Sequence, residues 1–122
     1  MKVLVTGGSG FLGINLIRFL RTKGVDEIRV LDIADFDYPE KNEPWLKFTL
    51  GDVRDIPAVE KITEGCDVVV HCAAALPLYS EKDIYTTEVD GSRNVLNAAR
   101  KFNLDRHVQI SSTAVYGVPK KH

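Results

Sequence analysis

Short apolar runs alternate along this chain with longer stretches in which apolar residues recur at helical spacing. The apolar runs predict five β-strands, over residues 3–5, 27–31, 46–50, 68–70 and 108–110. The helical spacing predicts helices over residues 11–23, 56–64 and 80–102. The run Val68-Val69-Val70 has no polar position, which is typical of a strand buried on both faces of a parallel sheet. The chain is therefore expected to form an α/β fold with a doubly wound parallel sheet and strand order 3-2-1-4-5.

The predicted elements have recognisable ends. Gly24 ends the first helix, Asp55 fits the N-cap of the second, and Gly65 follows the end of the second. Residues 34–44 are polar and contain Pro39 and Pro44, so they are interpreted as a surface loop that leads to the third strand without a helix.

A glycine-rich run, Thr6 to Gly13, comes directly after the first strand and opens the first helix. This order is typical of a strand that turns tightly into a helix around a phosphate. Gly7 and Gly8 would allow the turn, Gly10 would let the main chain approach the phosphates, and Gly13 would let the helix pack closely on the sheet. The run predicts a dinucleotide-binding site.

Two further features indicate which dinucleotide would bind. The free amides where the helix starts, at Phe11 and Leu12, would face the phosphates. Asp32 ends the second strand nineteen positions after Gly13, where its carboxylate could accept hydrogen bonds from both ribose hydroxyls and repel a 2′-phosphate. Residues 33–37 add no arginine or lysine to pair with such a phosphate, so NAD is favoured over NADP. The alternative is that Asp32 only caps a turn.

The other strands also place polar or small residues at the carboxyl edge of the sheet, where ligands of such folds bind. After the third strand, Asp52 could accept from the adenine amino group while the amide of Val53 meets the ring. Ala73 and Ala74, after the fourth strand, leave room for a flat cofactor. Residues 111–113, two serines and a threonine, follow the fifth strand near the expected nicotinamide.

Each of these residues has a structural alternative. Asp52 could only cap a turn, and the serine cluster could be a hydrogen-bonded turn. His71 and Cys72 are interpreted as packed strand residues rather than as a nucleophile or ligands.

Composition narrows the class of protein. The 122 residues suit a single domain but are few for an enzyme with cofactor and substrate domains, and 16 basic against 17 acidic residues predict no nucleic-acid or membrane partner. No signal peptide or membrane-spanning run is present, so a cytoplasmic protein is expected. Cys66 and Cys72 lack zinc-site spacing and are too few for a disulfide framework, so reduced thiols and no metal are expected.

Six motifs in order give the whole chain a family resemblance. They are Thr6-Gly7-x-x-Gly10-x-x-Gly13, Asp32, Gly51-Asp52-Val53-Arg54-Asp55, Val70-His71-x-Ala73-Ala74, Val89-x-Gly91-Ser92-x-Asn94-Val95-Leu96 and Ser111-Ser112-Thr113-Ala114-Val115-Tyr116-Gly117. The chain resembles the extended short-chain dehydrogenase/reductases, the NAD-dependent epimerase/dehydratase family that includes UDP-galactose 4-epimerases and dTDP-glucose 4,6-dehydratases. The resemblance implies a Rossmann fold, NAD, and a nucleotide-sugar substrate with a hydroxyl that is transiently oxidised.

The resemblance also implies roles for the end of the chain. Ser112 corresponds to the family's catalytic hydroxyl, which acts beside a tyrosine base and a lysine on a later helix. Tyr116 and Lys120 match Tyr-x-x-x-Lys by spacing, but Gly117 and Pro119 between them favour a loop, so this match is interpreted as a coincidence. The chain stops before the later helix. It is therefore expected to be the incomplete NAD-binding Rossmann domain of a larger enzyme, residues 1–122, truncated after the fifth strand and inactive alone.

Three expectations remain open at the level of the sequence. Glu88 stands where the family commonly has asparagine, and it either faces the nicotinamide or is a solvated helix residue. An unpaired fifth strand and an uncovered apolar face predict self-association or a homo-oligomer. The alternative function is a stand-alone, non-catalytic NAD-binding or redox-sensing module.

Overall fold

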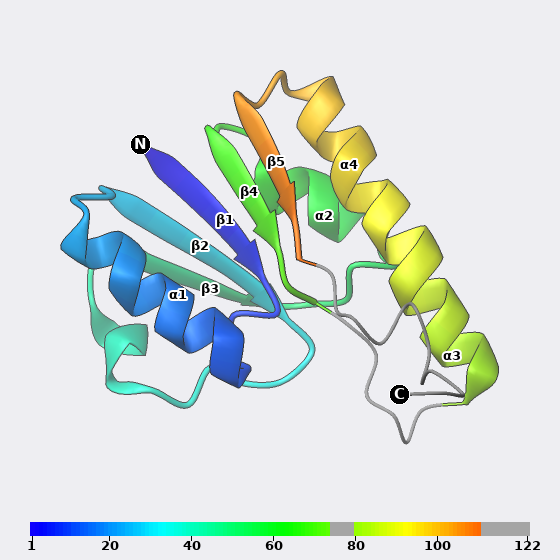
Figure 1. The fold of residues 1–122 in the computed structure, drawn as a ribbon, viewed down its shortest axis with the longest axis horizontal. Helices are drawn as coiled ribbons and strands as arrows, with labels where there is room; N and C mark the ends of the chain where they lie inside the picture. The colour runs from blue at the N-terminus through cyan, green and yellow to red at the C-terminus, as the bar shows by residue number, and fades with distance from the viewer. Residues whose placement is uncertain (74–79, 111–122) are drawn as a thin grey trace, which may run out of the picture.

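The computed structural model describes residues 1–73 and 80–110 and shows five parallel strands in one twisted sheet, ordered β3-β2-β1-β4-β5 (Figure 1). This is the predicted order. The strands are β1 (Lys2–Thr6), β2 (Glu27–Asp32), β3 (Leu46–Leu50), β4 (Val68–His71) and β5 (Arg106–Gln109). All five run in the same direction, so their carboxyl ends lie at one edge of the sheet, and this edge positions the site described below.

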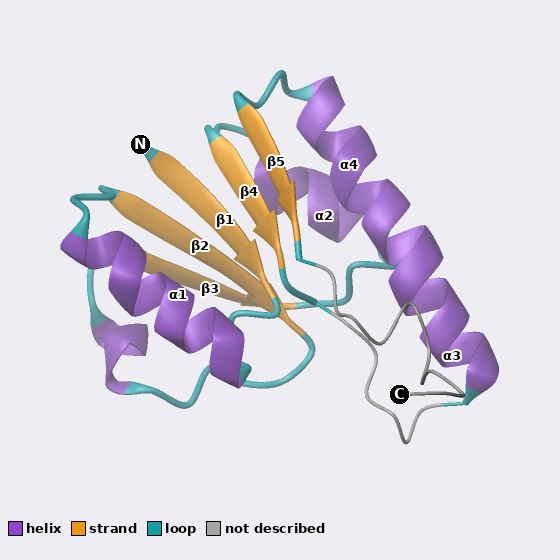
Figure 2. Cartoon of the chain, viewed as in Figure 1, coloured by secondary structure: helices purple, strands orange, loops and turns teal. Residues whose placement is uncertain are grey.

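Helices cover both faces of the sheet (Figure 2). Helix α1 (Phe11–Thr22) covers one face, and α2 (Ile56–Thr63) and α4 (Ser92–Lys101) cover the other, whereas α3 (Glu81–Tyr85) lies beyond the carboxyl ends of the strands. Asp55 is the N-cap of α2, as predicted, and its side chain accepts a hydrogen bond from the amide of Ala58. The loop between β2 and β3 contains a short 3₁₀ turn, Pro39–Asn42.

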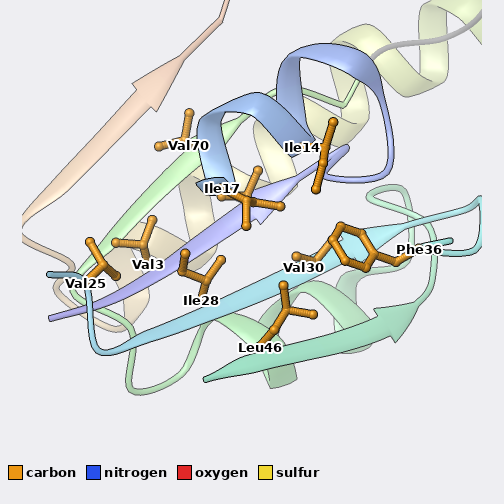
Figure 3. Packing of buried hydrophobic residues seen from close by; sticks show 10 residues of the cluster. Val3, Ile14, Ile17, Val25, Ile28, Val30, Phe36, Leu46 and Val70 are labelled. Carbon is orange, nitrogen blue, oxygen red and sulfur yellow. The ribbon is translucent and has the colours of Figure 1, made fainter. Parts of the chain in front are cut away.

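The alternation of side chains along the central strands divides the core into two layers. Val3 and Val5 of β1 belong to the cluster that packs against Ile17 of α1 on one face. Figure 3 shows Val3 and Ile17 in this cluster, with Ile28 and Val30 of the neighbouring strand β2. Leu4, between them, packs on the other face with Val95 of α4. Fully burying an aliphatic side chain of this size stabilises the fold by about 1.5–3 kcal/mol. The central strands read as continuous apolar runs because both faces are covered.

Two predicted elements differ in detail. The fifth strand begins at Arg106 rather than Val108, because it lies at the edge of the sheet and its pairing with β4 places Arg106 beside Val68 and Gln109 beside His71. Hydropathy does not mark such a strand, since its side chains are mostly exposed. The single helix predicted for residues 80–102 is interrupted between α3 and α4 by a π-helical segment, Thr86–Gly91. Such segments often occur at functional sites.

Within residues 1–73 and 80–110, no helix is long and apolar enough to cross a membrane. In the same ranges, no three histidine, cysteine or acidic side chains are grouped to hold a metal ion.

Candidate cofactor-binding site

A cavity of about 500 Å³ lies along the carboxyl ends of the central strands. Its size falls within the usual range for small-molecule sites, roughly 300–1,000 Å³. The cavity is lined by the β1–α1 loop, by the ends of β2, β3 and β4, and by one residue of the π-helical segment. The lining residues are Gly7, Ser9, Gly10, Leu31, Asp32, Ile33, Ala34, Gly51, Asp52, Val53, Arg54, Cys72, Ala73 and Thr87.

Two glycines of the β1–α1 loop, Gly7 and Gly8, and Gly13 of α1 are required by the fold itself. Gly7 has φ +72°, a left-handed conformation, and a Cβ there would lie 2.7 Å from the amide nitrogen of Ala73. A Cβ at Gly8 would lie 2.6 Å from the Val30 side chain, so Gly8 is constrained by packing and does not have a positive φ. A Cβ at Gly13 would overlap the carbonyl oxygen of Gly7 and lie 2.5 Å from the Cα of Gly8. Gly13 therefore lets the start of α1 pack closely on the turn at Gly7 and Gly8, whereas the prediction named the sheet.

Gly10 differs from these three glycines. It is the N-cap of α1 with φ −81°, which any residue can adopt, and a Cβ there would meet only the Gly7 carbonyl oxygen, at an ordinary 3.5 Å. The protein's own packing gives no reason for glycine at this position. The space beside Gly10 opens into the cavity, at the positive end of the α1 dipole.

The Asp32 carboxylate is held in place by two backbone amides. One oxygen accepts from the amide of Ser9 at 2.9 Å, and the other accepts from the amide of Ala34 at 3.0 Å. A carboxylate oxygen can accept about two hydrogen bonds, so each Asp32 oxygen retains one acceptor position. The turn-capping alternative thus describes part of what Asp32 does and leaves both oxygens able to accept from a ligand.

Asp52 lies in the cavity wall, but its carboxylate is engaged by Arg54. The guanidinium Nε and Nη2 contact the carboxylate at 2.7–3.1 Å, and the Arg54 amide donates to it at 2.9 Å. These bonds hold the pKa of Asp52 below its usual range and raise that of Arg54. Arg54 also donates from Nη1 to Asp83 and to the Thr86 hydroxyl, both at 3.1 Å. Arg54 therefore joins the end of β3 to α3 and the π-helical segment.

Helix α4 also forms hydrogen bonds to the loop between β3 and α2. The Asn94 side-chain amide donates to the carbonyl oxygens of Val53 and Arg54, at 3.1 and 3.2 Å. A Cβ at Gly91 would lie 2.5 Å from the Val53 side chain, so the two segments are in close contact there. These contacts bring Thr87 into the wall of the cavity.

Another part of the cavity wall lies where β4 ends beside β1. The Thr6 hydroxyl oxygen accepts from the amides of Cys72 and Ala73, at 3.1 and 3.2 Å, and lies 2.6 Å from Nδ1 of His71. His71 is buried, as expected, and burial lowers its pKa to about 4, with a smaller contribution from His107. Cys72 is only half-buried and lines the cavity, and burial raises the pKa of its thiol, which does not favour a nucleophilic thiolate.

A sequence model of the NAD-dependent epimerase/dehydratase family matches residues 3–122. The chain belongs to this family. NAD is the cofactor of the family, which agrees with the dinucleotide expected from the glycine-rich loop.

Individual relatives support the assignment. The chain is 34% identical to the low-salt glycan biosynthesis protein Agl12 of Haloferax volcanii, over 96% of this chain and 41% of that protein. It is 38% identical to the UDP-glucose 4-epimerase of Lactobacillus helveticus, over 99% of this chain and 38% of that protein. The crystal structure of the Bordetella bronchiseptica enzyme WbmG in complex with NAD and UDP superimposes with a TM-score of 0.84 and 32% identity, over 98% of this chain and 40% of WbmG. The chain thus spans about 40% of the length of these relatives.

The structure places many of the predicted site residues around one cavity. Gly7, Gly10, Asp32, Asp52, Val53 and Ala73 line one cavity. The side chains of Phe11 and Leu12 are exposed in the first turn of α1 and do not line it. Ala74, Ser112, Tyr116 and Lys120 lie outside the described residues.

Ser9, Arg54 and Thr87 are among the lining residues to which the sequence gave no role in the site. The signal for Arg54 was its position two residues after Asp52, where an acidic residue and an arginine can pair across a turn. No sequence signal placed Thr87 in the cavity, because its position depends on the π-helical segment.

Proposed function

We propose that this chain is the NAD-binding, N-terminal portion of a nucleotide-sugar epimerase or dehydratase. The observation that carries the proposal is the Asp32 carboxylate, which two backbone amides hold at the edge of the cavity with one acceptor position left on each oxygen. Two acceptors at this place fit the two hydroxyls of an adenosine ribose. The negative charge of Asp32 would disfavour the 2′-phosphate of NADP.

The space beside Gly10 fits the pyrophosphate. Among Gly7, Gly8, Gly10 and Gly13, only Gly10 has room for a Cβ without a clash in the protein, so an approaching ligand is a physical reason for glycine there. The amides of Phe11 and Leu12, in the first turn of α1, would donate to the phosphate oxygens together with the helix dipole. The side chains of Phe11 and Leu12 are not needed for this role.

The adenine would lie between the β3 and β4 ends. Asp52 and the backbone of Val53 would hold its polar edge, with Ala73 leaving space for its flat face. Because Arg54 already engages the Asp52 carboxylate, Asp52 would share its oxygens between the guanidinium and the adenine amino group.

Bound NAD supplies a hydride acceptor for oxidation of a sugar hydroxyl. Ser112 would hydrogen-bond that hydroxyl and orient it. The tyrosine base and its lysine would belong to the remaining part of the enzyme, since the relatives are more than twice as long as this chain. The chain alone is then expected to bind NAD without turnover.

Calorimetric titration with NAD and NADP tests the proposal. The chain is expected to bind NAD and to bind NADP much more weakly. Asp32→Ala should weaken NAD binding by about tenfold or more, because two hydrogen bonds to a charged acceptor are lost.

Asp35→Ala is the matched control for this titration. Asp35 lies three residues away and pairs with Lys41 outside the cavity, so this change should leave NAD affinity within about twofold. Absence of NAD binding by the folded wild-type chain would overturn the proposal. Equal losses in the two variants would show that Asp32 has no specific role.

Gly10→Ala gives a second test of the cavity. It should cost at most about 1 kcal/mol of stability, the usual cost of alanine at an N-cap. It should weaken NAD binding by about tenfold or more, because the new methyl group occupies space that the phosphates need. Denaturant unfolding and calorimetry on the same preparation separate the two effects. Unchanged NAD affinity would place the phosphates elsewhere.

A further inference from the structure

Hydrogen bonding defines the state of the buried His71 side chain. The Thr6 hydroxyl oxygen accepts from the amide of Ala73 and shares the amide proton of Cys72 with the Thr6 backbone carbonyl oxygen, so both of its acceptor positions face amide donors. Its own proton must therefore be donated to Nδ1 of His71, 2.6 Å away. Nδ1 is then an acceptor, so the neutral imidazole carries its proton on Nε2.

The protonated Nε2 of His71 faces helix α4. It lies 3.1 Å from the Ser92 hydroxyl oxygen, which also accepts from the side-chain amide of Gln109 at 3.4 Å. Ser92 is the first residue of α4, directly after the π-helical segment, and Gln109 is the last residue of β5. A continuous set of hydrogen bonds thus runs from the cavity wall across β1 and β4 to α4 and β5.

The cavity end of this set is in close contact with the glycine-rich loop. A Cβ at Gly7 would lie 2.7 Å from the Ala73 nitrogen that Thr6 holds. Thr6 and His71 are almost fully buried, so water cannot replace a lost partner, and an orphaned buried donor is costly.

We propose that His71 is a positioning residue. As the neutral tautomer with its proton on Nε2, it fixes the Thr6 hydroxyl, and through Thr6 it fixes the Cys72–Ala73 wall against the glycine-rich loop. Through Ser92 it joins this wall to the end of β5, three residues before Ser112. The effect on cofactor binding rests on the proposed function, whereas the tautomer of His71 does not.

Nuclear magnetic resonance of the chain with ¹⁵N-labelled histidine tests the tautomer without any ligand. The nitrogen shifts of His71 are expected to show an unprotonated Nδ1 and a protonated Nε2, unchanged between pH 8 and about pH 5. A proton on Nδ1, or titration near the ordinary histidine pKa of about 6.5, would overturn the assignment.

A double-mutant cycle tests the positioning role. Thr6→Val and His71→Phe are each expected to weaken NAD binding about tenfold. The double variant should bind about as weakly as either single variant, because both break the same connection. Thr6→Ser keeps the hydroxyl and should restore affinity to within about twofold. Losses that multiply in the double variant would overturn the proposal.

Thr63→Val is the matched control. Thr63 is also a fully buried threonine, but its hydroxyl donates to the Val59 carbonyl within α2, away from the cavity. The control should lower stability and leave NAD affinity within about twofold. If Thr63→Val weakens binding as much as Thr6→Val, general destabilisation explains the loss and the positioning role is wrong. If the wild-type chain binds no NAD, the proposed function fails, and the tautomer alone decides whether the hydrogen-bonded set exists.

Discussion

Replacing Gly13 with alanine is expected to destabilise the protein by at least about 2 kcal/mol and to lower its melting temperature by on the order of 10 °C. The added methyl group would meet the backbone of Gly7 and Gly8, and backbone atoms cannot move aside by changing rotamer. Helix α1 would have to shift away from the sheet, which would disturb the core around Ile17.

The direction of this effect is diagnostic. Gly13 lies inside α1, where helix propensity alone favours alanine by about 1 kcal/mol. A destabilised Gly13→Ala variant therefore shows that close packing outweighs propensity. Thermal unfolding followed by circular dichroism measures it, with Gly10→Ala as the comparison because it adds the same methyl group three residues earlier. Equal melting temperatures for Gly13→Ala and wild type would contradict the close approach of α1.

The stability of the protein is expected to fall by about 3 kcal/mol between pH 6.5 and pH 4 because of His71. Burial lowers the pKa of folded His71 to about 4, whereas an unfolded histidine has a pKa of about 6.5. Between these values the unfolded chain binds a proton that the folded chain does not, so acid favours unfolding. The contribution is fully present above pH 6.5 and decreases as the pH falls through this range.

Denaturant unfolding at a series of pH values measures this effect. His71→Phe cannot titrate, so its stability should change much less across this window. Burial also lowers the pKa of His107, with the same sign, and His107→Gln removes that smaller part. Asp52 and other carboxylates with lowered pKa values lose their contribution as the pH falls below about 4.5, so the range from pH 6.5 to 4.5 reports mainly on the histidines. A stability profile of the wild type that is flat from pH 6.5 to 4.5 would contradict the buried, neutral state of His71.

The sheet could be predicted because the central strands are buried on both faces and therefore consist almost entirely of apolar residues. Val3–Val5 and Val68–Val70 are apolar on both faces, and parallel strands with helices on both sides require this. The start of β5 could not be predicted in the same way. Arg106 and His107 belong to the strand through pairing with β4 at the sheet edge, and their polarity hides it from a hydropathy pattern.

The parts of the cavity that could be predicted are those whose role depends on neighbouring residues in the sequence. The glycine-rich loop and Asp32 are such cases, because a turn, a helix start and a strand end are each readable locally. The contacts that Arg54 and His71 make with distant segments were not predictable from the sequence. Their partners, Asp83 and Ser92, come from segments about 20 to 30 residues further along the chain, and only the fold brings them together.

The strand order also determines when, during synthesis, the central strand β1 can gain both of its neighbours. β1 is made first but lies in the centre of the sheet, between β2 and β4. Its pairing with β2 joins residues about 25 positions apart, whereas its pairing with β4 joins residues 65 positions apart. On the ribosome, one edge of the oldest strand therefore stays unpaired until Val68–His71 has emerged, and an apolar unpaired edge can associate with other chains. The first strand to be made therefore gains its second neighbour only after more than half of the chain has been synthesised.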